Sequence, residues 1–298
     1  MQARAQTPPA WNLRGLFDPG NGICASLSYI LGLSTPDICS LNFPREITDR
    51  LMATNRAWKA RLYDAYVSSG QAGQQGESIN PASLFRPRQA YLNHLITRHL
   101  PQSRDSRILD LGCGHGAVLY FLARAGYTRI AGVDTSPEQI QLAHRLGISQ
   151  AELGGVAEFL ARREEGSCDA VLLIDIIEHL APQEVFDLLD SVYRVLVPGG
   201  ICLVHVPNAE GLYGMRIRYG DFTHETAFTA KSASQIFHTI GFTKVESYED
   251  KPIVHGATSF VRRALWDCLT VFPRLLMLAE TGSRGAILSQ NFVIRATK

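Results

Sequence analysis

Two short stretches of the chain combine carboxylates with histidine: DIIEH (175–179) and DFTHE (221–225). A histidine beside acidic groups can take a proton from a hydroxyl during a reaction. The second stretch has no helical or strand period, and polar clusters in loops often carry function. The candidate catalytic residues are His224, Asp221, Glu225 and His179.

Structural roles would also explain these residues. Glu178 and His179 could begin a helix, whose positive end favours an acid. Thr229 could be an ordinary N-cap, with His224 forming hydrogen bonds within its loop. Composition does not decide between these alternatives, so we keep both.

A glycine-rich stretch, LDLGCGHG (109–116), is followed by GVD (132–134). An apolar run, a glycine turn, a helix and a second apolar run that ends in a carboxylate are typical of a nucleotide-binding βαβ unit. Gly112 and Gly114 permit positive φ and a close approach to a ligand, and Gly116 permits close packing of the following helix. The acid that ends the second run can accept both hydroxyls of a ribose.

The same glycines fit two kinds of nucleotide. Gly112, Gly114 and Ala117 satisfy the GxGxxA form of the dinucleotide fingerprint. Asp110, however, would repel a pyrophosphate, whereas it could hold an ammonium group by charge-assisted hydrogen bonds. The chain also lacks the YxxxK pair of NAD-linked sugar oxidoreductases, which stay a remote alternative.

Four motifs resemble the class I S-adenosylmethionine (SAM)-dependent methyltransferases, between about residues 107 and 241. They are LDLGCGHG, GVD, CDAVLLIDIIEHL (168–180) and LVPGGICLVHVPN (196–208). The resemblance implies an α/β, Rossmann-like fold: a doubly wound, mostly parallel seven-stranded sheet with helices on both faces. It also implies SAM as the cofactor.

The resemblance assigns the cofactor site residue by residue. Gly155 stands where many relatives carry an acid for the adenine amine, so backbone groups and apolar contacts around Val156 are expected to hold adenine. The residues expected at the cofactor are Asp110, Gly112, Cys113, Gly114, Gly116, Asp134, Thr135, Gln139, Val156, Asp175 and Ile176.

The acceptor is suggested by GDFTHETAFT (220–229) and AETGSRGAILSQN (279–291), which resemble bacterial methyltransferases of glycan and polysaccharide pathways. That resemblance predicts O-methylation of a sugar hydroxyl, with His224 as general base and Asp221 or Glu225 orienting it. A small phenolic, quinone-type or carboxylic acceptor is the alternative. Similar quinone-pathway enzymes hold a divalent metal at the position of 175–179, where Mg²⁺ would suit the oxygen ligands, but we expect no metal.

Composition is that of one large α/β domain with additions: 298 residues, 46% hydrophobic, net charge +1. The balanced charge argues against a nucleic-acid partner. Six cysteines are scattered without a CxxC pair, which favours reduced thiols and a cytoplasmic protein. Oligomeric state is left open.

We expect three parts: a poorly ordered extension (1–44), an N-terminal helical cap (45–104) and a methyltransferase domain (105–298) with a helical insertion at 250–285. Within the insertion, residues 260–280 form a basic, Trp-bearing amphipathic pattern that could contact the inner face of a membrane. A packing helix or a dimer-interface helix is the simpler explanation of this pattern, and it is the one we favour.

Strands and helices are expected to alternate. The expected strands are 107–111, 129–133, 150–153, 169–174, 200–206 and a final antiparallel strand at 291–297. The expected helices are 45–66, 87–99, 116–125, 136–146, 155–164, 182–196 and 231–240. The carboxyl ends of parallel strands meet at one edge, where ligands bind.

Overall fold

The computed structural model describes residues 59, 62 and 80–298. The chain divides into two compact units, Met1–Trp58 and Lys59–Lys298, and all described residues belong to the second. The predictions for 1–44 and for most of the helix at 45–66 lie outside the described residues. The three-part division of the chain stays a prediction.

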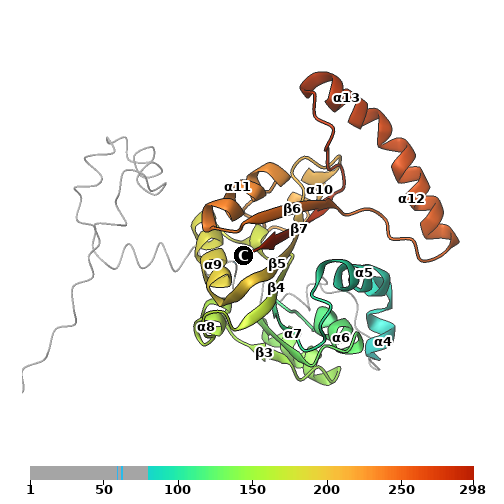
Figure 1. The fold of residues 1–298 in the computed structure, drawn as a ribbon. Coiled ribbons are helices and arrows are strands. Elements are labelled where there is room, and N and C mark those ends of the chain that lie inside the picture. Colours follow the sequence, from blue (N-terminus) through green and yellow to red (C-terminus); the bar gives the residue numbers. More distant parts are fainter. Residues whose placement is uncertain (1–58, 60–61, 63–79) are drawn as a thin grey trace, which may run out of the picture. The chain divides into compact units, whose positions relative to one another are not determined.

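The described residues form a seven-stranded sheet with the order β3-β2-β1-β4-β5-β7-β6 (Figure 1). Its first five strands run parallel, and β7 runs antiparallel to both β5 and β6. This confirms the predicted fold class. The strands are β1 (Arg107–Leu111), β2 (Arg129–Asp134), β3 (Ala151–Leu153), β4 (Cys168–Ile174), β5 (Leu196–Pro207), β6 (Lys244–Glu249) and β7 (Asn291–Thr297).

Burial on both faces explains why the central strands read as continuous apolar runs. In β4, Ala170 and Leu172 belong to one core, while Val171 and Leu173 belong to the other. The first core is covered by α5 (Gln89–His99), α6 (Ala117–Arg124) and α7 (Pro137–Arg145). The second is covered by α8 (Val156–Ala161), α9 (Pro182–Val195) and α11 (Ala230–Ile240).

Local signals fix where the helices begin. Ser136 and Thr229 cap α7 and α11, each accepting a hydrogen bond from a backbone N–H three residues later. The N-cap role weighed for Thr229 is therefore real. Glu178 and His179 do not begin α9, because they lie in a separate 3₁₀ turn, η3 (Ile177–His179).

Some predicted boundaries were wrong by a few residues. Pro87 falls within a 3₁₀ turn, η2 (Arg86–Arg88), which follows α4 (Pro81–Leu84), so the predicted helix at 87–99 begins only at Gln89. The predicted helix at 155–164 ends at Ala161.

The insertion forms two helices, α12 (Ala257–Leu269) and α13 (Val271–Thr281), which project from the sheet (Figure 1). Their exposed apolar side chains include Leu269 at 70% and Phe272 at 74%. Among the described residues, no helix is long and apolar enough to cross a membrane. Contact of 260–280 with a membrane surface stays a prediction.

Candidate functional site

The glycine turn after β1 has the predicted backbone. Gly112, Gly114 and Gly116 have φ of 69°, 53° and 84°, in the left-handed region that favours glycine. A Cβ on Gly112 would lie 1.9 Å from Cδ1 of Ile176, the residue that opens the turn after β4. The two turns therefore approach as closely as they do only because Gly112 has no side chain.

Asp134, at the end of β2, is held by backbone groups. It accepts hydrogen bonds from the N–H of Gly114 (2.9 Å) and from the N–H of Ser136 (2.8 Å). Burial raises its pKa, while these N–H groups oppose that effect. Each carboxylate oxygen keeps capacity for a further donor, as two ribose hydroxyls would require.

Asp110 is the buried group that most needs a ligand. Its side chain is 1% exposed, and Oδ2 has no hydrogen-bond partner among the described residues. Burial, with the nearby charge of Asp134, raises its pKa to about 8. An unpartnered carboxylate beside a glycine turn suits a ligand that brings an ammonium group.

Two further residues that the sequence predicts at the cofactor, Gln139 and Cys113, lie at this turn. Gln139 is buried, and its Oε1 lies 3.0 Å from Nδ1 of His115, whose ring stacks on Phe85. Cys113 is a buried free thiol, and a Cβ on Gly132 would lie 2.8 Å from its Cβ. The side chains of Gln139 and Cys113 therefore both pack at the glycine turn.

Val156 is the first residue of α8. Glu158, which the sequence did not point to, lies in the first turn of the same helix. Oε2 of Glu158 lies 2.0 Å from the position that a Cβ on Gly155 would occupy. The carboxylate of Glu158 thus folds back toward the N-terminus of α8, where an acid is favourable.

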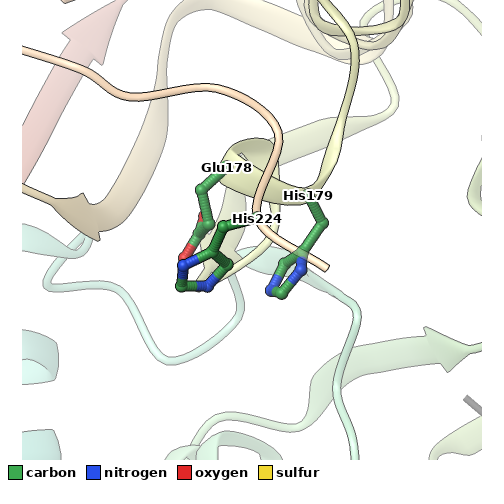
Figure 2. Close-up of side chains that lie close together, drawn as sticks. All are labelled: Glu178, His179 and His224. Carbon is green, nitrogen blue, oxygen red and sulfur yellow. The ribbon is translucent and has the colours of Figure 1, made fainter. Parts of the chain in front are cut away.

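The two acid–histidine stretches meet in space. One oxygen of Glu178 and one nitrogen each of His179 and His224 lie within 4.8 Å of one another (Figure 2). The loop after α10 (Gly214–Arg218) is fastened to η3, because the N–H groups of Glu225 and Thr226 both donate to the carbonyl of Glu178. The predicted clusters therefore form one site.

Hydrogen bonds set the tautomers of both histidines. His224 Nδ1 lies 3.2 Å from the carbonyl oxygen of Arg218, which can only accept, so the proton is on Nδ1 and Nε2 has a free lone pair. Thr223 donates its hydroxyl to Asp221 (2.6 Å) and accepts from Nδ1 of His179 (2.7 Å). The proton of the neutral His179 ring is therefore also on Nδ1.

The predicted orienting groups for His224 were wrong. The partner of its ring is the Arg218 carbonyl; Asp221 acts through Thr223 on His179 instead. Glu225 forms an ion pair with Lys59. The carboxylate of Asp221 accepts a hydrogen bond from Thr223 and that of Glu225 pairs with Lys59, so neither bonds to the His224 ring.

Burial sets the charge state of the cluster. It raises the pKa of Glu178 to about 8, helped by the charge of Asp175, so Glu178 is largely protonated at neutral pH. Burial and the neighbouring His224 lower the pKa of His179 to about 4, so that ring is neutral. Burial also acts to raise the pKa of Asp221, but the hydrogen bonds from Thr223 outweigh it and the pKa lies below its usual value.

The cluster offers the ligands of a metal site. Two imidazoles and one carboxylate suit Zn²⁺, Mn²⁺ or Fe²⁺ better than Mg²⁺, which prefers oxygen. Asp175, which the sequence grouped with Glu178 and His179, is turned away to His205.

A bridge of charges around the buried His205, which sequence reasoning missed, begins at the half-exposed Asp175. This residue has a φ of 58°, which is uncommon outside glycine. Its Oδ1 lies 2.5 Å from Nδ1 of His205, and Nε2 of His205 lies 3.4 Å from Oδ2 of Asp250. Burial lowers the pKa of His205, but the two carboxylates outweigh it and raise that pKa to about 10.

A family model described as a methyltransferase domain matches residues 84–247, more than half of the chain. The chain belongs to the methyltransferase domain family. SAM is the cofactor of this methyltransferase domain, and the unpartnered Oδ2 of Asp110 beside the glycine turn fits the ammonium group that SAM carries. The fold is that of SAM-dependent methyltransferases.

Solved structures agree with the fold. A SAM-dependent methyltransferase from Archaeoglobus fulgidus is 22% identical, with a TM-score of 0.56 over 72% of this chain and 94% of the other. Phosphoethanolamine N-methyltransferase 2 of Haemonchus contortus, solved with SAM, is 19% identical, with a TM-score of 0.50 over 70% of this chain and 51% of the other.

Among curated relatives, a ubiquinone biosynthesis O-methyltransferase from Maricaulis maris is 33% identical over 135 residues. The match covers 42% of this chain and 52% of the relative. The chain thus spans about half the length of the curated relatives it matches.

Proposed function

We propose that the protein is a SAM-dependent O-methyltransferase that acts on a phenolic or quinol-type hydroxyl. The observation that carries the proposal is the meeting of Glu178, His179 and His224 just after Ile176, whose side chain packs against the turn at Gly112. The names of the O-methyltransferase relatives support a hydroxyl acceptor.

The acid–base state of the cluster favours a phenol over an aliphatic alcohol. SAM supplies an activated methyl group, so the protein must align a hydroxyl oxygen and accept its proton. The free Nε2 of His224 can accept that proton while the Arg218 carbonyl holds the ring in place. A neutral imidazole is a weak base for an alcohol but a better match for a phenol, whose pKa is about 10.

A sugar hydroxyl is the second candidate. It is favoured by the resemblance of residues 220–229 and 279–291 to glycan-pathway methyltransferases. Because an alcohol needs stronger activation, this candidate would require a metal ion at Glu178, His179 and His224 to lower the pKa of the hydroxyl. The two candidates therefore differ in metal dependence.

The first test is methyl transfer by the His224→Ala variant, followed by mass spectrometry of a catechol acceptor. We expect the rate to fall by about 100-fold or more, since general base catalysis typically contributes that much. Binding of S-adenosylhomocysteine should not change. His94→Ala, at an exposed position of α5, is the control. Unchanged turnover in His224→Ala would contradict the assigned role.

Removal of metal separates the two candidates. After dialysis against EDTA, the phenolic mechanism predicts unchanged transfer to catechol. If transfer is lost and added Mn²⁺ or Mg²⁺ restores it, the cluster is a metal site and the base mechanism is wrong. Transfer to glucose or glucuronate, but not to catechol, would favour the sugar acceptor.

A further inference from the structure

A cavity of about 480 Å³ lies between the start of α5, the segment after β6, α12 and the start of β7. Its volume lies within the usual range for small-molecule sites. The residues of its wall used below are Tyr91, Asp250, Arg262, Trp266 and Asn291. Tyr91 comes before the glycine turn in the sequence, and the other four residues come after residue 247, where the match to the family model ends.

Three of these wall residues carry polar atoms that lack partners. Tyr91 Oη, Trp266 Nε1 and Asn291 Oδ1 are buried and form no hydrogen bond with the described residues. They are half of the six such side-chain atoms in the described part of the chain. Buried polar groups are nearly always paired, so their gathering around one cavity indicates a ligand that supplies partners.

These atoms specify the chemistry of that ligand. The indole N–H of Trp266 can only donate and the amide oxygen of Asn291 can only accept. Burial, with the charges of Asp250 and Asp175, raises the pKa of Tyr91, which keeps its hydroxyl protonated. A matching ligand has both a hydroxyl donor and an oxygen acceptor.

Arg262 adds a positive charge to the wall. Its side chain forms no ion pair among the described residues, whereas the neighbouring Lys251 pairs with Glu249 and Asp267. Asp250 is already engaged with His205. Arg262 is therefore available for an anionic group of the ligand.

The bridge Asp250–His205–Asp175 connects the cavity to the site. Asp250 lines the cavity, and Asp175 directly precedes Ile176 at the cofactor turn. The charge of Asp175 acts on both Tyr91 and Glu178. The cavity thus adjoins the carboxyl end of β4, where the proposed reaction takes place.

We propose that this cavity binds the body of the acceptor, as an aromatic ring with hydroxyl groups and a carboxylate directed at Arg262. This inference rests on the proposed function. It adds Tyr91, Trp266, Asn291 and Arg262 as residues that determine specificity.

Calorimetry with a matched pair of probes tests the assignment, with S-adenosylhomocysteine present at saturation. The probes are 3,4-dihydroxyphenylacetate and 4-methylcatechol, which differ only by the carboxylate. Wild-type protein should bind the acid about tenfold more tightly, and Arg262→Gln should abolish this difference. Arg284→Gln, which removes an exposed arginine outside the cavity, should preserve it.

A second variant tests the indole N–H. Trp266→Phe keeps a ring in the wall but removes the donor, so both probes should bind about five- to tenfold more weakly. Binding of S-adenosylhomocysteine should be unchanged, which shows that the variant is folded. Leu265→Ala, an exposed position on the same helix, should bind both probes as the wild type does.

The outcomes separate this inference from the proposed function. Wild-type affinities in Arg262→Gln and Trp266→Phe would overturn the cavity assignment even if methyl transfer proceeds. The expected losses of affinity without methyl transfer would support the cavity and contradict the proposed function. Failure of both probes to bind, or tighter Arg262-dependent binding of glucuronate, would overturn the aromatic class of ligand.

Discussion

At the scale of single residues, burial decides what each ionisable group can do. Asp110 and Glu178 are both acids with a pKa raised to about 8, but their surroundings differ. Asp110 lies beside the glycine turn and lacks a partner, which suits a cation. Glu178 faces two imidazoles, which suits proton transfer or a metal.

Asp110→Asn removes the negative charge that is assigned to the ammonium group of the cofactor. We expect S-adenosylhomocysteine to bind about 10- to 100-fold more weakly by calorimetry, since a charged hydrogen bond contributes that much. Asp105→Asn, at an exposed position just before β1, is the control and should bind normally. Equal affinity in both variants would refute the assignment.

Although Asp110→Asn should weaken cofactor binding, it should stabilise the cofactor-free fold. The pKa of Asp110 is about 8 when folded and about 4 when unfolded. The folded state therefore binds more protons between these values, and this group makes stability fall as pH rises toward 8. Cofactor-free Asp110→Asn should melt at a higher temperature than wild type at pH 8, with a smaller gain at pH 5.

His205 should stabilise the fold in a pH-dependent way. Its raised pKa means that its contribution is complete below about pH 6.5 and is lost as pH rises through about 10. His205→Gln leaves Asp175 and Asp250 without a cation, so we expect a loss of roughly 1–2 kcal/mol in the free energy of unfolding at pH 6, less than for a fully buried pair because the side chain of Asp175 is 48% exposed. Urea unfolding at pH 6 and pH 10 checks this, because the difference from wild type should shrink at pH 10.

At the scale of elements, the site depends on two turns that nearly touch. The turn after β1 approaches the turn after β4 at Gly112 and Ile176. The loop that follows α10 is bound to η3 by two backbone hydrogen bonds. The sheet edge thus assembles the site from segments that are distant in sequence.

Gly112→Ala tests that close approach. Gly147→Ala is its matched control, because Gly147 also has positive φ, 79°, but nothing lies within 4 Å of its Cβ position. Both variants should lose about 1 kcal/mol of stability from backbone strain. Only Gly112→Ala should also weaken S-adenosylhomocysteine binding strongly, because its methyl group would displace Ile176. Similar binding by both variants would contradict the packing argument.

At the scale of the whole molecule, α12 and α13 contribute in two ways. Arg262 and Trp266 of α12 line the cavity. Elsewhere the two helices expose Leu269, Phe272 and other apolar side chains. This exposed surface, with arginines beside it, is the pattern from which the sequence predicts contact with a membrane.

Sedimentation with vesicles checks this prediction. Wild-type protein should pellet more with vesicles that contain phosphatidylglycerol than with phosphatidylcholine alone. Phe272→Glu should reduce pelleting, whereas Leu153→Glu, at an exposed position of β3, should not. A lack of lipid-dependent pelleting, with a dimer in light scattering that Phe272→Glu dissociates, would assign the surface to a second copy.

The fold class, the final strand and the cofactor were all predictable from local sequence patterns. These depend on local signals: apolar strands, a glycine turn at 112–116, and an acid at the end of the next strand, all within a few tens of residues. Residues other than glycine adopt the positive φ of this turn only at a cost in free energy, so the glycine pattern indicates the turn before the fold is known.

Which side chains lie together could not be predicted from local patterns and became clear from the three-dimensional fold. It joined Glu178 to His224, gave Asp175 to His205 and Asp250, and made a carbonyl the partner of His224. Parallel strands bring their carboxyl ends together whatever their separation in sequence, and the path of each loop then selects the partners. The cavity also depends on the three-dimensional fold, because its wall is formed by residues of α5, α12 and β7, which lie far apart in the sequence.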